Sequence, residues 1–197
     1  MFNNEILSLS EDNTTLSASN TDNDTLSLSN TDNNVLGDAG DRTALSNLIS
    51  RADPGSVVYL PNDYKFTTGS SSNLGITIGK NLIIDGQGNT IDANKLGRIF
   101  YISGNNVTLK NINFKNALFS GAAGGGAIYF TGTYLTIENC TFESNRNTHS
   151  SKGGGAIYGA YRPLALINIT NSTFTNNSVE NGGGALYFDN PRPEETV

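Results

Sequence analysis

The amino-acid sequence predicts an all-β protein, a right-handed single-stranded parallel β-helix of about five coils with a short N-terminal capping helix. Its 22 glycines, and many Asn, Ser and Thr residues, favour turns and short strands over long helices. A glycine motif recurs at a constant spacing, and a strand motif recurs between its copies. Repeats of such a period are typical of coils that stack and bury their apolar faces against one another.

Residues 1–42 are predicted to be a disordered polar leader of low complexity. A ten-residue unit occupies residues 15–24 and again residues 25–34, and each copy has few apolar side chains. Burying so few cannot offset an ordering cost of about 1–2 kcal/mol per residue. The alternative, that its Asp and Asn runs bind calcium, is disfavoured because they lack the glycine and closing glutamate of a calcium loop. We expect no metal site and no cofactor.

The β-helix domain is predicted to span residues 43–190, followed by a polar tail, 191–197. Its apolar residues at 44–49 fall on one helical face, behind a cap at Asp41 or Thr43. We expect this helix to cover the open end of the stack. The β-branched and aromatic residues at 57–60 then predict the first strand.

The glycine motif, Gly-Gly-Gly-Ala-(Ile/Leu)-Tyr, begins at Gly124, Gly153 and Gly182, with starts 29 residues apart. Glycines permit a positive φ at a tight corner and a close approach of neighbouring backbones. The alternative, a phosphate-binding loop, requires a following helix, whereas each copy here precedes a predicted strand.

The strand motif occupies residues 107–114, 135–142 and 167–174, with an imperfect first copy at 82–85. The alternation of apolar residues slips by one position in the middle of each copy, which indicates a corner of the coil. An Asn lies at each corner, and equivalent side chains are expected to form an amide ladder and an inward aromatic stack. The predicted ladder residues are Asn111, Asn139 and Asn171, and the predicted stack is Phe114, Phe142 and Phe174.

Cys140 is the only cysteine, so an intrachain disulfide is excluded. Its position in the strand motif predicts a small buried side chain. The alternative, a reactive nucleophile, requires a nearby base, but the only histidine, His149, lies in a polar loop.

The tyrosines of the glycine motif are predicted to point outward and to form an exposed aromatic stripe, with Tyr129, Tyr158 and Tyr187 on successive coils. One interpretation is stacking between strands, worth about 0.2–1 kcal/mol per pair. The other is a ligand-binding surface for sugars or a partner protein. Polar loops beside the stripe add Tyr161, Arg162 and Arg146 to this candidate surface.

Charge is distributed unevenly along the chain. Residues 1–41 carry eight acidic residues and no Lys or Arg, while the remainder carries ten acidic and twelve basic residues. The remainder has no basic stripe, which argues against nucleic acid as a partner. No apolar stretch is long enough to span a bilayer, and the first residues do not form a signal peptide. We therefore expect any export signal to lie outside this chain.

The glycine motif contains Gly-Gly-Ala-Ile or Gly-Gly-Ala-Leu, and Phe-x-x-Asn occurs at 142–145 and 174–177. These tetrapeptides resemble the pairs found in polymorphic outer membrane protein repeats. The wider region resembles adhesin-like surface proteins with a pectin-lyase-like β-helix, and residues 85–92 are similar to the opening of such domains. Residues 114–117 depart from Phe-x-x-Asn, and Asp85 replaces the corner Asn.

The resemblance implies a non-enzymatic adhesin-like module, at the cell surface or extracellular, that binds glycans or surface proteins of another cell. The alternative is a polysaccharide lyase or glycoside hydrolase of the same fold, for which Asp85, Asp92 and Arg98 are the candidate catalytic residues. Both aspartates flank a glycine-rich turn and are more simply interpreted as turn residues. A third hypothesis is a rigid spacer that binds nothing.

Overall fold

The computed structural model describes residues 40–67, 74–121, 123–148, 153–160, 165–180 and 184–189. Residues 1–39 of the predicted leader and the predicted tail, 191–197, lie outside the described residues. The described residues belong to a compact unit that begins at Ala39.

Helix α1 (Arg42–Arg51) begins at the cap that the sequence offered. The backbone N–H of Ala44 donates to Asp41 Oδ1 at 2.7 Å, which satisfies one of the free donors of the first turn. Leu45 and Ile49 are buried and join the hydrophobic core next to the first coil. The predicted N-terminal helix is therefore confirmed.

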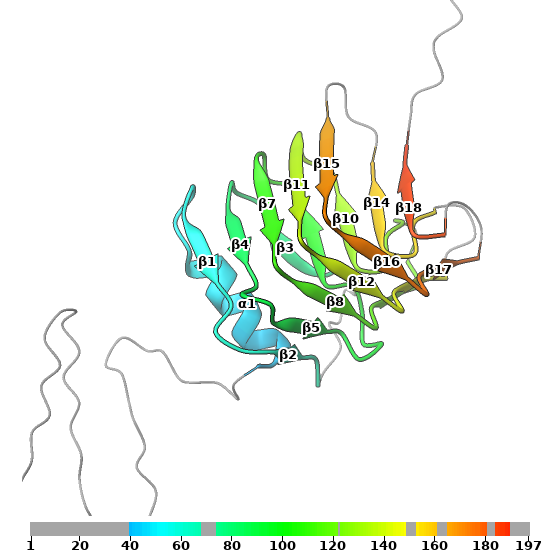
Figure 1. Cartoon of the computed structure of the whole chain (residues 1–197), viewed down its shortest axis with the longest axis horizontal. Helices are drawn as coiled ribbons and strands as arrows, with labels where there is room; N and C mark the ends of the chain where they lie inside the picture. The colour runs from blue at the N-terminus through cyan, green and yellow to red at the C-terminus, as the bar shows by residue number, and fades with distance from the viewer. Residues whose placement is uncertain are drawn as a thin grey trace, which may run out of the picture. The chain divides into compact units, whose positions relative to one another are not determined.

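Short parallel strands form four sheets in the described residues (Figure 1). Sheet A contains β1 (Val57–Tyr59), β4 (Ile83–Asp85), β7 (Val107–Lys110), β11 (Tyr134–Glu138) and β15 (Leu166–Thr170). Sheet B contains β2 (Tyr64–Lys65), β5 (Thr90–Asp92), β8 (Asn113–Lys115), β12 (Thr141–Glu143) and β16 (Thr173–Thr175). Sheet C contains β3 (Ile76–Ile78), β6 (Phe100–Ile102), β10 (Ile128–Phe130), β14 (Ile157–Gly159) and β18 (Leu186–Phe188). Sheet D contains β9 (Leu118–Phe119), β13 (Arg146–Asn147) and β17 (Ser178–Val179).

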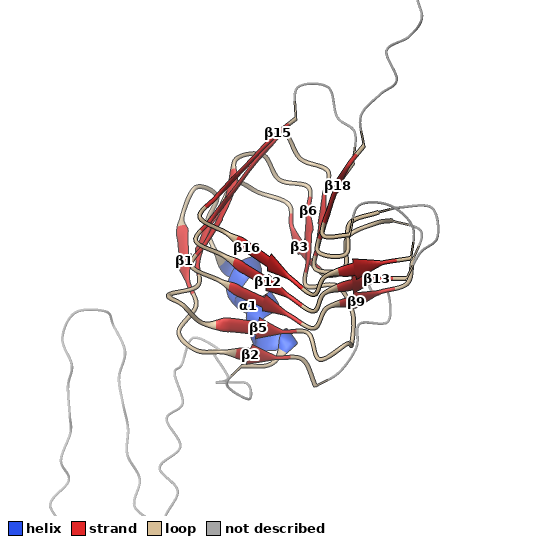
Figure 2. Ribbon diagram, turned by 45° about the vertical axis from the view of Figure 1, so that its right-hand side comes forward, coloured by secondary structure: helices blue, strands red, loops and turns tan. Residues whose placement is uncertain are grey.

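Each later coil runs from sheet A through sheets B and D to sheet C, and then returns to sheet A one level further along (Figure 2). The parallel β-helix predicted from the repeats is confirmed. Five strands in one sheet are separated by four complete turns, so the solenoid has about four turns where the sequence indicated about five coils.

In-register pairing places equivalent side chains in columns inside the solenoid. Phe142 pairs with Phe114 on one side and with Phe174 on the other. The ring centroids of the first pair are 4.7 Å apart and those of the second 4.8 Å apart, with nearly parallel planes. Phe114 and Phe142 are fully buried, whereas Phe174 is half-buried on the last coil. Side chains thus fill the interior, and function must depend on outward residues and turns.

Candidate interaction surface

The corner between sheets A and B carries the asparagines singled out in the sequence. Asn111, Asn139 and Asn171 all have positive φ, at 54°, 55° and 48°, a conformation that Asn tolerates better than most residues. Asn139 Nδ2 donates to Asn111 Oδ1 at 3.2 Å, and Asn111 Nδ2 donates to Asp85 Oδ1 at 2.9 Å. The side chains of Asp85, Asn111 and Asn139 therefore connect three successive coils.

Asp85 joins this ladder from an unexpected position. The strand register aligns it with Lys110, one residue before the corner, and its carboxylate also accepts from the backbone N–H of Gln87 at 3.0 Å. Lys110 Nζ lies 3.2 Å from the second carboxylate oxygen. Burial raises the pKa of Asp85, but the hydrogen bonds from Asn111 and Gln87 and the nearby Lys110 outweigh it, so the pKa lies below its usual value of 3.8.

Asp85→Asn is expected to lower the free energy of unfolding by about 1 kcal/mol at neutral pH, because the amide retains an acceptor but loses the charge. The lowered pKa means that the ionised carboxylate favours the folded state above pH 3.8, and that this contribution is lost as pH falls through the folded-state pKa. Urea unfolding of both proteins should therefore give a difference that shrinks below pH 3.8. An equal difference at pH 7 and pH 3 would contradict this assignment.

A second asparagine ladder lies inside the solenoid, and reasoning from residue alternation missed it. Asn145 is fully buried; its Nδ2 donates to the carbonyl of Phe114 at 3.1 Å, and its Oδ1 accepts from the backbone N–H of Ala117 at 3.0 Å. Asn177 repeats the arrangement one coil later, donating to the carbonyl of Phe142 at 2.8 Å. The Asn of Phe-x-x-Asn thus hydrogen-bonds a bend of the backbone from within, and is not a surface contact residue.

The tyrosines of the glycine motif form one column on sheet C, together with a tyrosine that the sequence analysis did not select. Tyr101 pairs with Tyr129, which pairs with Tyr158, which pairs with Tyr187. Their ring centroids are 5.3, 5.6 and 5.7 Å apart in that order. The signal for Tyr101 was its place in the middle of an apolar-Tyr-apolar triplet, as in residues 128–130.

Exposure along this tyrosine column differs from the expectation of an exposed stripe. Tyr158 is only 3% exposed, and its hydroxyl contacts the carboxylate of Asp189, so its ring is not available to a ligand. Tyr101, Tyr129 and Tyr187 are half-buried. Tyr158 therefore serves in stacking between strands, whereas Tyr101, Tyr129 and Tyr187 keep part of their surface accessible to a ligand.

Four of the described glycines before the tyrosine strands are required by the structure. A Cβ on Gly124 would lie 2.5 Å from the ring of Tyr158 on the next coil, and one on Gly153 would lie 2.6 Å from the ring of Tyr187. Gly125 and Gly154 have φ of 81° and 80°, a conformation that favours glycine. The glycines of the motif therefore form a turn and also leave space for the tyrosine ring of the next coil.

Arg98 is fully buried beside this column, and its position was not foreseen. Its guanidinium donates to the carbonyls of Ala123, Gly124 and Gly125 at 2.9, 2.6 and 2.8 Å. Its Cζ lies 3.6 Å from the ring centroid of Phe119, within cation–π range. Burial lowers the pKa of Arg98 to about 9, while the electrostatic effect of Tyr129 acts in the opposite direction, so the side chain is charged at neutral pH.

The remaining predicted residues do not gather at one place. Arg146 lies on β13, with an exposed guanidinium 3.6 Å from Glu180. Cys140 is buried, and burial raises the pKa of its thiol to about 11, which opposes thiolate chemistry. Tyr161, Arg162 and His149 lie outside the described residues.

The three residues considered for an enzyme have separate structural partners. Asp85 belongs to the corner ladder, and Arg98 is enclosed by backbone carbonyls. Asp92 Oδ1 accepts from the backbone of Asn94 at 2.8 Å and from Asn116 Nδ2 at 2.9 Å, which stabilises the turn after β5. The interpretation of the aspartates as turn residues agrees with these contacts.

The chain matches the family model of the Chlamydia polymorphic membrane protein repeat over residues 139–160 and 171–189. Both segments are similar to this repeat. Each begins at a corner asparagine, Asn139 or Asn171, and continues through strands of sheets B, D and C. Each matched segment therefore covers three sides of a coil and ends just after the tyrosine strand.

These repeats are a feature of surface, adhesin-like proteins. No curated protein and no solved structure gives a significant match to the chain. In the described part of the chain, no helix combines the length and apolar character needed to cross a membrane.

Proposed function

We propose that this chain is a non-enzymatic adhesin-like module of the cell surface that binds a glycan or a protein of another cell. The observation that carries the proposal is the outward tyrosine column on sheet C, built on the same coils that carry the polymorphic membrane protein repeats. A rigid solenoid holds these rings at fixed spacings, so little conformational entropy is lost when they contact a partner.

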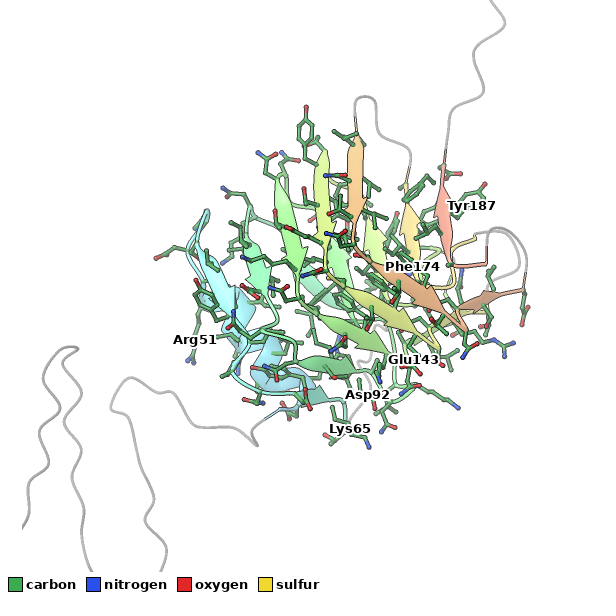
Figure 3. All side chains as sticks on the ribbon, in the orientation of Figure 1. Arg51, Lys65, Asp92, Glu143, Phe174 and Tyr187 are labelled. Carbon is green, nitrogen blue, oxygen red and sulfur yellow. The ribbon has the colours of Figure 1, made fainter. Side chains whose placement is uncertain are left out.

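The contact residues are proposed to be Tyr129 and Tyr187, which are half-buried, and Arg146, whose side chain is 54% exposed. Tyr161 and Arg162 extend the same proposal to residues outside the described part. Arginine and tyrosine are both enriched among the residues that dominate binding energy at interfaces. Figure 3 shows Tyr187 on the outer side of the last sheet C strand.

The experiment is a glycan array together with a cell-binding assay on the purified chain. Tyr129→Ser combined with Tyr187→Ser should weaken binding at least tenfold, because both rings leave the contact surface. Tyr134→Ser is the matched control, since Tyr134 is an exposed tyrosine on sheet A, and it should bind as the unmodified chain does. Circular dichroism must show equal folding of all variants.

Unchanged binding by the double variant would assign these tyrosines to stacking alone. Absence of binding to every glycan and cell type would favour the rigid spacer. Incubation with uronic-acid polymers and calcium tests the alternative that the chain is a polysaccharide lyase. Appearance of unsaturated product would overturn the proposal of a non-enzymatic module.

A further inference from the structure

The outer face of sheet B contains a groove of about 390 Å³, far along the coil from the tyrosine column. Apart from the backbone at Phe142, whose ring points inward, every lining residue presents a polar side chain. The lining residues are Thr90, Asn113, Lys115, Thr141, Phe142, Glu143, Thr173 and Thr175. A groove of this composition offers hydrogen bonds and little apolar area.

The polar side chains are arranged in two columns that run across the strands, along the axis of the solenoid. The strand register aligns Thr90, Asn113, Thr141 and Thr173 in one column. It aligns Lys115, Glu143 and Thr175 in the other, two residues further along each strand. Adjacent strands of a sheet lie about 4.8 Å apart, so similar groups recur at a short and constant interval.

Part of this array is already ordered, and part is available to a ligand. The hydroxyl of Thr141 donates to Asn113 Oδ1 at 2.7 Å, which fixes both side chains while leaving the lone pairs of the hydroxyl oxygen. Within the described residues, the hydroxyls of Thr173 and Thr175 have no hydrogen-bond partner. Threonine has few rotamers on a strand, so ordering these hydroxyls costs little entropy.

The charges in the groove cancel. Lys115 Nζ lies 2.9 Å from Glu143 Oε2, and these are the only charged residues in its lining. Figure 3 shows Glu143 on the same side of the ribbon as Asp92 and Lys65, another pair of opposite charges on neighbouring strands. The surface therefore has no excess of either sign to attract a polyanion or a polycation.

We propose that this groove binds a neutral, linear polysaccharide that lies across the strands of sheet B. An extended chain of hydroxyl groups matches a periodic array of hydroxyl, amide and paired charged groups, and its lack of charge matches the neutral groove. A protein partner would need an apolar centre, which the lining does not provide. This site is independent of the tyrosine column, and either can exist without the other.

The test uses the whole chain and affinity electrophoresis in gels that contain a soluble β-glucan, a mannan or polygalacturonate. The chain should be retarded by at least one of the two neutral polymers, equally at low and high salt, because no net charge is neutralised. Thr141→Val combined with Thr173→Val and Thr175→Val should weaken that retardation at least tenfold. Valine retains the branched shape of threonine, so the strands are preserved.

The variant Tyr129→Ser with Tyr187→Ser should retain full retardation by the neutral polymer, which separates this site from the tyrosine column. The proposal would be overturned by no retardation by either neutral polymer, by equal retardation of the valine variant, or by retardation by polygalacturonate alone that disappears with salt. Self-association of the chain that the valine variant abolishes would assign the face to a second copy instead, and would also overturn it.

Discussion

Phe142→Ala is expected to lower the free energy of unfolding by about 3–5 kcal/mol, a large part of the 5–15 kcal/mol typical of a folded domain. Phe142 is fully buried and stacks on a ring at both faces, 4.7 Å from Phe114 and 4.8 Å from Phe174. The coils above and below are fixed by their own backbone hydrogen bonds and cannot collapse into the space. Urea unfolding followed by circular dichroism measures the loss.

Phe174→Ala is the matched control, since it removes the same ring from the last described coil. Phe174 is half-buried and stacks on one described ring, so its replacement should cost less than half as much as that of Phe142. Equal losses for the two variants would show that the stack does not act through burial between neighbouring coils.

Arg98→Met should destabilise the chain by about 3–5 kcal/mol, although methionine fills much of the same volume. Removing a buried charge can stabilise a protein when its partner charge is removed too, but here the partners are the carbonyls of Ala123, Gly124 and Gly125. These acceptors would be left without the guanidinium, and two of them, on Gly124 and Gly125, belong to buried residues. The contact with the face of Phe119 would also be lost.

The destabilisation of Arg98→Met should be concentrated in the turn before β10. Hydrogen exchange should accelerate at the backbone N–H of Gly126, which donates to the next coil. The stability of Arg98→Lys should lie between those of the unmodified chain and Arg98→Met. An ammonium keeps the positive charge, but it lacks the planar, forked set of donors with which the guanidinium reaches several carbonyls. Lys65→Met, at an exposed residue of β2, is the control for loss of positive charge and should change stability by no more than about 0.5 kcal/mol.

The architecture could be predicted because one repeat of the sequence corresponds to one coil, so residues at equivalent positions of successive repeats pair with one another. The slip in alternation between Leu109 and Ile112 marked a corner, and the structure places Asn111 there in a left-handed conformation. Phe114, Phe142 and Phe174 formed a column because the same corner precedes each of them. A repeat reveals which residues are equivalent, and stacking then makes equivalent residues neighbours.

The features that escaped prediction depend on contacts that break the repeat. The position of Arg98 within its coil is occupied by glycine in the later coils. The repeat therefore offered no equivalent side chain from which the inward direction of Arg98 could be inferred. The hydroxyl of Tyr158 contacts Asp189, a residue one coil further along and outside the repeated motif, so the motif alone did not indicate this contact. Alternation also gave no indication of Asn145, because a polar residue inside a coil looks like one that faces water.

The outer column of charges on sheet B has a consequence for how the chain avoids misfolding. Lys65, Asp92, Lys115 and Glu143 alternate in sign from one strand to the next. Stacking in the interior favours the correct pairing of coils only weakly. A phenylalanine would stack on the ring of the coil after next as readily as on the ring of the adjacent coil. If a coil were skipped during assembly, however, Lys65 would lie against Lys115 and Asp92 against Glu143, and both repulsions would disfavour the wrong order.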